Sequence, residues 1–451
     1  MFTTDKNNVG DIVPYESIKA FISKHISLQP RYDKLDRYYR GEHDILKRDK
    51  TGSLANNRIV CNHAKDITDT VTGYFVGEPI KYVGDNAATL LEWFNIANIP
   101  SVDMSLGKSM SKFGIAYELI CMSDDEKTTP LSFCIDPRNT FVVCDDTLQH
   151  RPLFGVYYCP TYDMSLSHTG YKVNVYTKSA AVEYVADTNF NIISEGEAQI
   201  NPFDDVPIIA YDNNDERQGD YEQVTNLIDA YNTLMSDRVN DKEQFVDALL
   251  LIVNGTLADT EEEAEEVCNR LKRDRILELP GETDAKYLFR TFDESGVDIL
   301  RKAIKEDIHS LAMVPCLSDE NFAGNASGVA IEYKLLGLEE VVKTKQRKFT
   351  EAAKRRIALY NRINMAKGGT DFGKVELTFT RGLPKNITDL ANVVSQLDGV
   401  VPQKLLLPLL PFVKDVDEAM QLLKQEKEQN ADESMRQFGM QLNTPLGDDD
   451  E

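Results

Sequence analysis

The chain has 451 residues, enough for about two to four domains, and its 42% hydrophobic and 27% charged residues are typical of a globular protein. This composition excludes a fibrous repeat and a globally disordered chain. The formal net charge is −24, from 50 Lys and Arg against 74 Asp and Glu. A protein that grips nucleic acid by covering phosphates with cations would carry the opposite charge, so tight wrapping of nucleic acid is excluded as well.

The first part of the chain has helical periodicity. In residues 14–42, Ile18, Phe21, Ile22 and Ile26 form an apolar stripe at spacings of three and four, which predicts one helix over the whole segment. Similar patterns predict three further helices, over 58–76, 86–97 and 102–112.

From residue 115 the periodicity changes to that of strands. Short runs rich in Tyr, Val and Phe alternate with turn residues such as Asp, Pro, Gly and Asn. This pattern predicts an antiparallel sheet, with strands over 115–122, 131–135, 140–144, 154–159, 172–177 and 181–186.

Long helices dominate the second half. We expect helices over 219–248, 295–313 and 329–366, each with an apolar stripe that needs a packing partner. A compact α+β insert separates the first two, with an acidic helix over 260–273 and strands over 249–253, 276–279 and 285–289. The remaining predicted elements are a strand over 375–380, helices over 386–397 and 402–430, and a disordered acidic tail over 431–451.

The sequence contains no complete motif for catalysis, a cofactor or a metal. No two of the six histidines lie within four residues of each other, which excludes HExxH and similar helical metal pairs. Gly368, Gly373 and Lys374 approach a P-loop, but Val375 stands where the Mg²⁺-binding Ser or Thr belongs. Seven cysteines without a CxxC pair predict neither a zinc ribbon nor a disulfide framework. We therefore expect no enzyme, no cofactor and no metal site.

The chain has no apolar signal peptide, and its longest mostly apolar stretch, near 400–413, contains three prolines and is too short to span a bilayer. These features predict a soluble intracellular protein with no membrane contact.

One stretch departs from the acidic background. Residues 343–362 contain eight cations and a single anion, Glu351. Three interpretations stay open: a solvated helix face, a subunit interface that meets an acidic neighbour, and direct contact with DNA. For the interface, the candidate residues are Lys343, Arg347, Lys348, Lys354 and Arg355.

The order of these parts, with six local segments, resembles the portal proteins of tailed bacteriophages, the siphovirus-type portal family. The similarity extends over about residues 15–430. The segments are YYRGEHDI at 38–45, NRIVCNHAKDITDTVTGYFVGEPI at 57–80, VPIIAYDNND at 206–215, DAYNTLMSDRVNDKEQFVDALLLIVNG at 229–255, FAGNASGVAIEYKLLGLE at 322–339 and LLLPLLPFVKDVDEAMQLL at 405–423.

The resemblance implies an α+β portal-type architecture that assembles as a ring, usually of twelve copies, at one capsid vertex. It has long stem and wing helices, a β-rich wing, a small α+β clip and a helical crown. Transferred to this chain, the regions are a wing over 1–218, stem helices over 219–248 and 295–313, a clip over 249–294, a tunnel loop over 314–328, a wing helix and strand over 329–385, a crown over 386–430 and the tail over 431–451.

The resemblance also implies sites. The tunnel loop would face DNA, and its Gly and Asn residues tolerate left-handed backbone while Pro315 disfavours helix. An ordinary connector between two helices is the alternative. The tunnel-loop candidates are Pro315, Asp319, Asn321, Phe322, Gly324, Asn325 and Gly328, and the candidates for docking at the clip are Gly255, Glu262, Arg270, Pro280 and Gly281.

The implied role is a portal through which double-stranded DNA is packaged and ejected. The implied partners are the terminase large subunit, the head-tail adaptor, and the major capsid and scaffolding proteins. The implied location is the virion, with assembly in the host cytoplasm. Two other classes stay open: an acidic scaffold or adaptor without a DNA channel, which would not explain the break between two long helices, and a DNA-processing enzyme, which would need a metal or nucleotide site.

Overall fold

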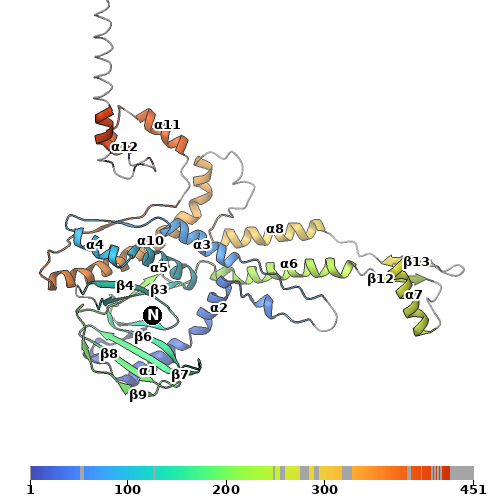
Figure 1. Ribbon diagram of the computed structural model, residues 1–451, viewed down its shortest axis with the longest axis horizontal. Helices are drawn as coiled ribbons and strands as arrows, with labels where there is room; N and C mark the ends of the chain where they lie inside the picture. Colours follow the sequence, from blue (N-terminus) through green and yellow to red (C-terminus); the bar gives the residue numbers. More distant parts are fainter. Residues whose placement is uncertain are drawn as a thin grey trace, which may run out of the picture. The chain divides into compact units, whose positions relative to one another are not determined.

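The protein, represented by a computed structural model, divides into two compact units, Met1–Gly382 and Leu383–Glu451 (Figure 1). The structure describes residues 2–50, 55–124, 128–246, 249–253, 260–274, 284–288, 294–316, 328–382, 387–397 and 399–407, and then 410, 413, 416 and 419–426. It confirms the mixed α+β class.

Helices dominate the N-terminal part, as predicted, but residues 14–42 form two helices and not one. The break has a local cause, because Pro30 has no backbone N–H and its ring would clash with the carbonyl group of Ile26 inside a continuous helix. Proline is accommodated in the first turn of the second helix, where its fixed φ is favourable. The elements are β1 (Phe2–Thr4), α1 (Tyr15–Ile26), α2 (Gln29–Arg40), α3 (His63–Val76), β2 (Lys81–Val83), α4 (Ala88–Ile96) and α5 (Ile99–Phe113).

The strands that follow form two sheets. The predicted strands are present, and β1, β9, β10 and β11 add to them. The larger sheet has the order β1-β5-β6-β7-β8-β10, with β9 also paired to β8. It is not purely antiparallel as predicted, since β1 pairs with β5 in parallel. The strands are β3 (Ile115–Met122), β4 (Pro130–Ile135), β5 (Thr140–Asp145), β6 (Pro152–Tyr162), β7 (His168–Thr177), β8 (Ala180–Ala186), β9 (Ile192–Glu195), β10 (Gln199–Ile200) and β11 (Ile208–Asp212).

Each sheet has its own apolar core. Helix α1 covers the larger sheet with Ile18 and Ile22, which pack against Phe141 and Phe154. The smaller sheet, of order β11-β3-β4, belongs to a larger core shared with α3, α5 and the long helix α10 (Gly328–Ala366). Helix α10 contacts β11, α3 and α4, so it runs through the middle of the first unit.

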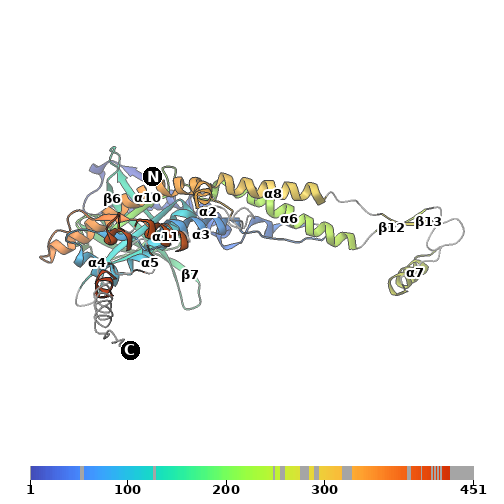
Figure 2. The ribbon, with the colours of Figure 1, turned by 90° about the horizontal axis from the view of Figure 1, so that it is seen from above.

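Two helices extend from this body side by side in both ribbon views (Figures 1 and 2). They are α6 (Thr225–Val246), which follows a 3₁₀ turn at Glu222–Val224, and α8 (Glu294–Leu311). The structure thus confirms the helices predicted over 219–248 and 295–313. The first is shorter than predicted, because it begins at Thr225 and ends at Val246.

The insert between α6 and α8 contains β12 (Leu249–Val253), the acidic helix α7 (Glu261–Asp274) and β13 (Asp284–Leu288). Strands β12 and β13 pair antiparallel. The predicted strand over 276–279 lies outside the described residues.

The end of the first unit and the second unit contain short elements. Strand β14 (Glu376–Thr378) pairs with β2, which places the predicted strand of 375–380 at the edge of the first unit. The second unit contains α11 (Ile387–Leu397) and α12 (Gln403–Leu406), with further helical residues at 416 and 419–426. The predicted tail over 431–451 lies outside the described residues.

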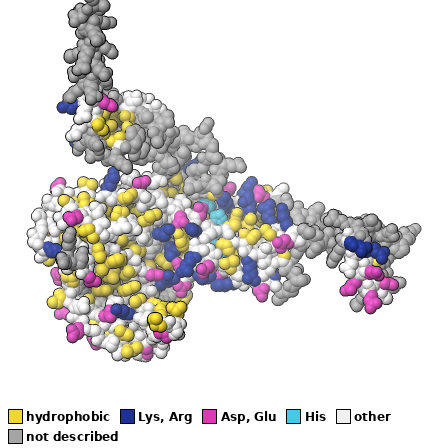
Figure 3. Space-filling view, viewed as in Figure 1, with side chains coloured by type: hydrophobic (Ala, Val, Ile, Leu, Met, Phe, Trp, Pro, Cys, Tyr) yellow, Lys and Arg dark blue, Asp and Glu magenta, His cyan; other side chains and the backbone are white. Residues whose placement is uncertain are grey.

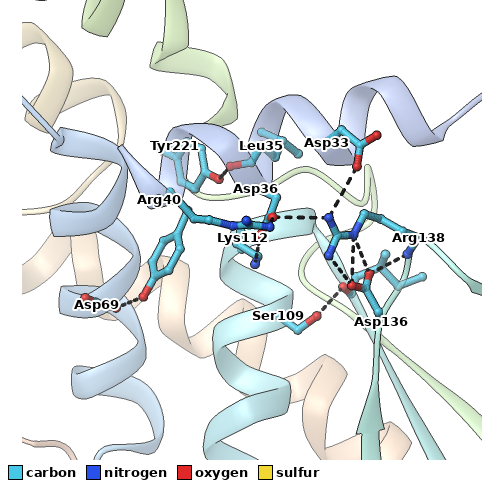
Figure 4. A network of polar contacts seen from close by, with 12 residues as sticks. Asp33, Leu35, Asp36, Arg40, Asp69, Ser109, Lys112, Asp136, Arg138 and Tyr221 are labelled. Carbon is cyan, nitrogen blue, oxygen red and sulfur yellow. Dashed lines mark hydrogen bonds and ion pairs between the residues drawn. The ribbon is translucent and has the colours of Figure 1, made fainter. Parts of the chain in front are cut away.

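A polar network connects α2, α5 and the turn before β5 in the body from which α6 and α8 extend (Figure 4). Asp36 of α2 accepts hydrogen bonds from Lys112 of α5 at 2.6 Å and from Arg40, and it forms an ion pair with Arg138 at 3.3 Å. Arg138 also binds Asp136 at 2.6 Å. Burial alone would raise the pKa of Asp36, but the hydrogen bonds from Lys112 and Arg40 lower it below its ordinary value.

We expect Asp36→Asn to reduce the free energy of unfolding by about 2 kcal/mol at neutral pH, the usual loss for hydrogen bonds to a charged group. Because the pKa of Asp36 is lower in the folded than in the unfolded chain, its contribution is present above about pH 4 and is lost as the pH falls through the folded pKa. Denaturant unfolding at several pH values measures both effects.

The matched control is Asp33→Asn, at an exposed carboxylate 3.5 Å from Arg138, for which we expect a loss of about 0.5 kcal/mol or less. Equal losses for the two variants would contradict a bracing role for Asp36.

Candidate functional site

The predicted tunnel loop connects α8 to α10, and the structure describes its two ends. At the first end α8 stops at Leu311, whose carbonyl group accepts a hydrogen bond of 2.5 Å from the side chain of Gln223. Met313 has left-handed backbone with φ 56°, which turns the chain sharply. The backbone N–H of Val314 then donates to the carbonyl oxygen of His309 at 3.0 Å, and the Val314 side chain is buried. The chain is therefore anchored in the core up to Val314.

The second end is the start of α10. Gly337 passes close to the first end, since a Cβ atom added to it would lie 3.3 Å from the sulfur of Met313. Leu335 and Leu338 are buried in the core that also contains Val314. Both described ends of the connection thus pack against the same core.

Most of the predicted tunnel-loop residues lie between these ends. Pro315 is described and partly buried, and Gly328 is the first residue of α10, so the helix begins one residue earlier than predicted. The others lie outside the described residues, namely Asp319, Asn321, Phe322, Gly324 and Asn325. The DNA-facing role of this loop stays a prediction.

The basic stretch of α10 enters the core of the first unit. Arg356 is fully buried (0% exposed) and binds two buried carboxylates, Asp103 of α5 at 2.6 Å and Glu118 of β3 at 2.7 Å. The hydroxyl group of Tyr82 lies 3.1 Å from its guanidinium. Burial raises the pKa of Asp103 even though the charge of Arg356 opposes this.

A second buried pair joins α10 to the segment before α6. Lys345, which is 1% exposed, donates to Asp220 at 2.6 Å. Asp220 also accepts from the hydroxyl group of Ser111 in α5 at 2.5 Å. Burial lowers the pKa of Lys345, and the carboxylate of Asp220 opposes this effect.

Several cations that were candidates for a subunit interface have partners within the same chain. Lys348 binds Asp215 at 2.5 Å, and Arg355 binds Asp205 at 3.1 Å. Lys343 lies 3.9 Å from Glu339, one helical turn earlier. Acidic residues of the same chain thus lie beside these three cations, which do not require an acidic neighbouring subunit as a partner. The picture of a single solvated helix face is wrong, since Lys345 and Arg356 are buried.

Two candidates keep the properties that an interface requires. Arg347 and Lys354 are exposed, and no carboxylate of the described residues lies within 4.0 Å of either side chain. Arg347 and Lys354 therefore remain candidates for the predicted subunit interface.

The predicted docking residues of the insert are only partly described. Glu262 and Arg270 are exposed on α7, whereas Gly255, Pro280 and Gly281 lie outside the described residues. The surface of α7 carries a group of acidic side chains (Figure 3), which Glu262, Glu263, Glu265 and Glu266 supply. The helix offers a charged face and not an apolar one.

Sequence patterns could not identify the buried ion pairs. A run of cations on a helix with 3.6-residue periodicity is normally a solvated face, and the partners of Arg356 come from an earlier helix and strand. The only available signal was the position of Arg356 on the apolar stripe, next to Ala353, Ile357 and Tyr360.

The first unit is thus an α+β body that buried ion pairs brace and from which two long paired helices extend. Among the described helices, none is long and apolar enough to cross a membrane.

Sequence comparison shows the family of the protein. A model of the family described as "Phage portal protein, SPP1 Gp6-like" matches residues 18–433, and the chain therefore belongs to the phage portal protein family. The portal protein of Bacillus phage SPP1 is 24% identical over 447 residues, which cover 92% of this chain and 86% of that protein. The portal protein of Clostridium phage phiCD119 is 29% identical over 230 residues, which cover 50% of this chain and 49% of that protein, so this second match spans about half the relative's length.

Proposed function

We propose that the protein forms the portal ring of a tailed bacteriophage, at the capsid vertex through which double-stranded DNA is packaged and later ejected. The observation that carries the proposal is the pair of helices α6 and α8, which extend from an α+β body in a chain of the portal family. Two such helices expose apolar side chains, among them Ile299 and Leu300, that a ring of copies would cover. We propose twelve copies.

We assign the regions by the same reasoning. The wing comprises 1–218 and 329–385, the stem 219–248 and 295–313, the clip 249–294, the tunnel loop 314–328 and the crown 386–430. The division of the chain after Gly382 supports a separate crown. The fixed ends of the connection at Val314 and Leu335 support a loop whose middle changes shape while its base does not.

The partners follow from these regions. The clip would dock the terminase large subunit during packaging and the head-tail adaptor afterwards, and the acidic face of α7 suits a basic partner surface. The wing would contact the major capsid and scaffolding proteins. The protein would act without catalysis or a cofactor, in the virion and, during assembly, in the host cytoplasm.

The ring can be tested directly by negative-stain electron microscopy of the purified full chain. We expect rings with a central hole. Small monodisperse particles without a hole would contradict the proposal and favour the alternative of an acidic scaffold or adaptor. A packaging assay with capsids assembled around this protein then tests the channel, since rings that package no DNA would contradict the portal role.

The exposed cations of α10 give a second test. We expect Arg347→Glu with Lys354→Glu to shift rings toward monomers at low ionic strength, because two attractions become repulsions at each interface. A change of about 1.4 kcal/mol per interface corresponds to a tenfold weaker association. Sedimentation velocity at increasing salt measures the shift, which should shrink as salt screens the charges.

The control variant carries Lys24→Glu and Lys178→Glu, the same change of charge at two exposed residues near the larger sheet. Rings that resist both pairs of substitutions would contradict the interface role. Intact rings that lose DNA contact only with the α10 pair would favour direct binding of DNA by this helix.

A further inference from the structure

Two histidines that are far apart in the sequence meet at the base of α8. His63 is the first residue of α3, Asp66 lies one turn later on the same helix, and His309 lies in the last turn of α8. One ligand atom from each of the three side chains can be chosen so that all lie within 4.8 Å of one another. The imidazole rings of His63 and His309 have centroids 5.4 Å apart and cross at 81°.

The ring nitrogens in this cluster lack the partners that buried polar atoms normally have. The Nε2 atoms of His63 and His309 are both buried and make no hydrogen bond within the described residues. His309 is only 4% exposed, and its Nε2 atom points to the carboxylate of Asp66 at 3.8 Å, too far for a hydrogen bond. An unpaired buried polar atom costs free energy, so two of them beside a carboxylate need an explanation.

The hydrogen bond on the other side of His309 fixes its tautomer. The Nδ1 atom lies 3.3 Å from the carbonyl oxygen of Val314. Since a carbonyl oxygen can only accept, Nδ1 must carry the proton, and Nε2 then presents its lone pair toward Asp66. Metal-binding histidines are typically oriented in this way, with the distal nitrogen donating to a backbone carbonyl group.

Burial disfavours the charged form of both rings. It lowers the pKa of His63 to about 4, and it also lowers the pKa of His309, although Asp66 opposes the second shift. Two neutral imidazoles and a carboxylate are the donor set of three-ligand zinc sites, which leave a fourth position for water.

We propose that His63, Asp66 and His309 bind one divalent first-row transition-metal ion, with zinc as the best fit to two imidazoles and a carboxylate. Zinc bonds of about 2.0–2.2 Å place ligand atoms about 3.4 Å apart, so atoms that lie within 4.8 Å of one another have to approach by up to about 1.4 Å. Asp66 is exposed, with 58% of its side chain accessible, and can rotate to close the site. The exposed carboxylate of Asp66 connects the cluster to solvent, and histidine side chains are visible near the base of the paired helices (Figure 3).

The charge of Lys305 acts against binding. It lies one turn before His309 and lowers the pKa of both His63 and His309, so a positive charge is close to the site. His43 adds a smaller effect of the same sign on His63. The single carboxylate of Asp66 offsets this charge, and the site should therefore bind more weakly than one without a neighbouring lysine.

The ion would join the first turn of α3 to the last turn of α8, directly before the chain turns at Met313 and Val314. The base of the predicted tunnel loop would then be held by a metal ion as well as by apolar packing. The proposal depends on these three side chains alone and not on the portal function.

The test is a zinc titration of the full chain after treatment with a chelator, by competition with a chromophoric chelator and by metal analysis after gel filtration. We expect one zinc ion per chain and an increase in the melting temperature on binding. His63→Gln and His309→Gln should each weaken binding by about 100-fold or more, since removal of even an outer partner of a metal ligand costs about 10–100-fold.

The controls separate this site from other binding. His168→Gln, at an exposed histidine of β7, should bind zinc like the wild type. Asp66→Asn, at an exposed side chain, should fold normally and still lose affinity, which keeps the test valid if the histidine variants fail to fold. Lys305→Gln should tighten binding by a few-fold. Co²⁺ should give a ligand-field spectrum in the wild type and in His168→Gln but not in Asp66→Asn.

The proposal would be overturned by a wild-type chain that retains no zinc after gel filtration. It would also be overturned if Asp66→Asn and a folded His63→Gln or His309→Gln bound zinc as tightly as the wild type, because the cysteines or the acidic surface would then be the ligands.

Discussion

Arg356→Met is expected to lower the free energy of unfolding by about 3–5 kcal/mol. Methionine fills most of the space of the arginine side chain but removes the charge that compensates Asp103 and Glu118, both of which stay buried. Asp103, whose pKa burial already raises, then has to take up a proton on folding. The raised folded-state pKa adds stability as the pH falls, so the difference from the wild type should be smaller at about pH 5 than at about pH 8. Chemical denaturation at both pH values measures the effect.

Glu351→Met is the matched control, at an exposed charged position of the same helix, with an expected change within about 0.5 kcal/mol. Adding Glu118→Gln to Arg356→Met should restore part of the loss, because it removes one of the two uncompensated charges. The buried ion pair would be irrelevant to stability if Arg356→Met unfolded no more easily than Glu351→Met.

Gly114→Ala is expected to cost about 3 kcal/mol or more. Gly114 joins α5 to β3 with φ +81°, a left-handed conformation that costs about 1–2 kcal/mol for a residue with a Cβ atom. An added Cβ atom would lie 2.0 Å from the carbonyl oxygen of Arg217 and 2.3 Å from its carbonyl carbon. Because these are backbone atoms, the segment that leads into α6 would have to move, which adds about 1–3 kcal/mol of overpacking.

Gly368→Ala separates the two contributions. Its φ of +78° is almost the same, but no atom lies within 4 Å of an added Cβ atom. We expect only the backbone term, about 1–2 kcal/mol. Thermal and denaturant unfolding of the two variants should therefore differ clearly, and similar losses would show that the close approach to Arg217 does not matter.

Periodicity and turn residues predicted most of the first unit because its cores are built from regular apolar stripes. The helices α3, α5 and α10 and the strands β3 to β8 follow such patterns. Strands β1 and β10 are too short to show a period, and β9 is fully exposed, so its sequence does not alternate. The break between α1 and α2 depends on Pro30, and a prediction from apolar spacing alone takes no account of a proline.

The site was less predictable because its contacts join residues far apart in the chain. The pairing of Lys345 with Asp220 cannot be inferred from the cations alone, and neither can the approach of His309 to His63. A spacing argument tests only neighbours in the sequence, whereas these groups meet through tertiary packing. The tunnel-loop and docking residues belong to the portal resemblance and stay predictions.

The ion pairs of α10 also set the axial position of this helix. A slide of one turn, about 5.4 Å, would remove Arg356 from both of its carboxylates and Lys345 from Asp220 at the same time. Apolar stripes alone tolerate such slippage more readily, because one aliphatic contact can replace another. Buried ion pairs at Lys345 and Arg356 therefore fix the position of this 39-residue helix along its axis. A shift of the helix along its axis would therefore have to break the Lys345 pair and both pairs of Arg356 together.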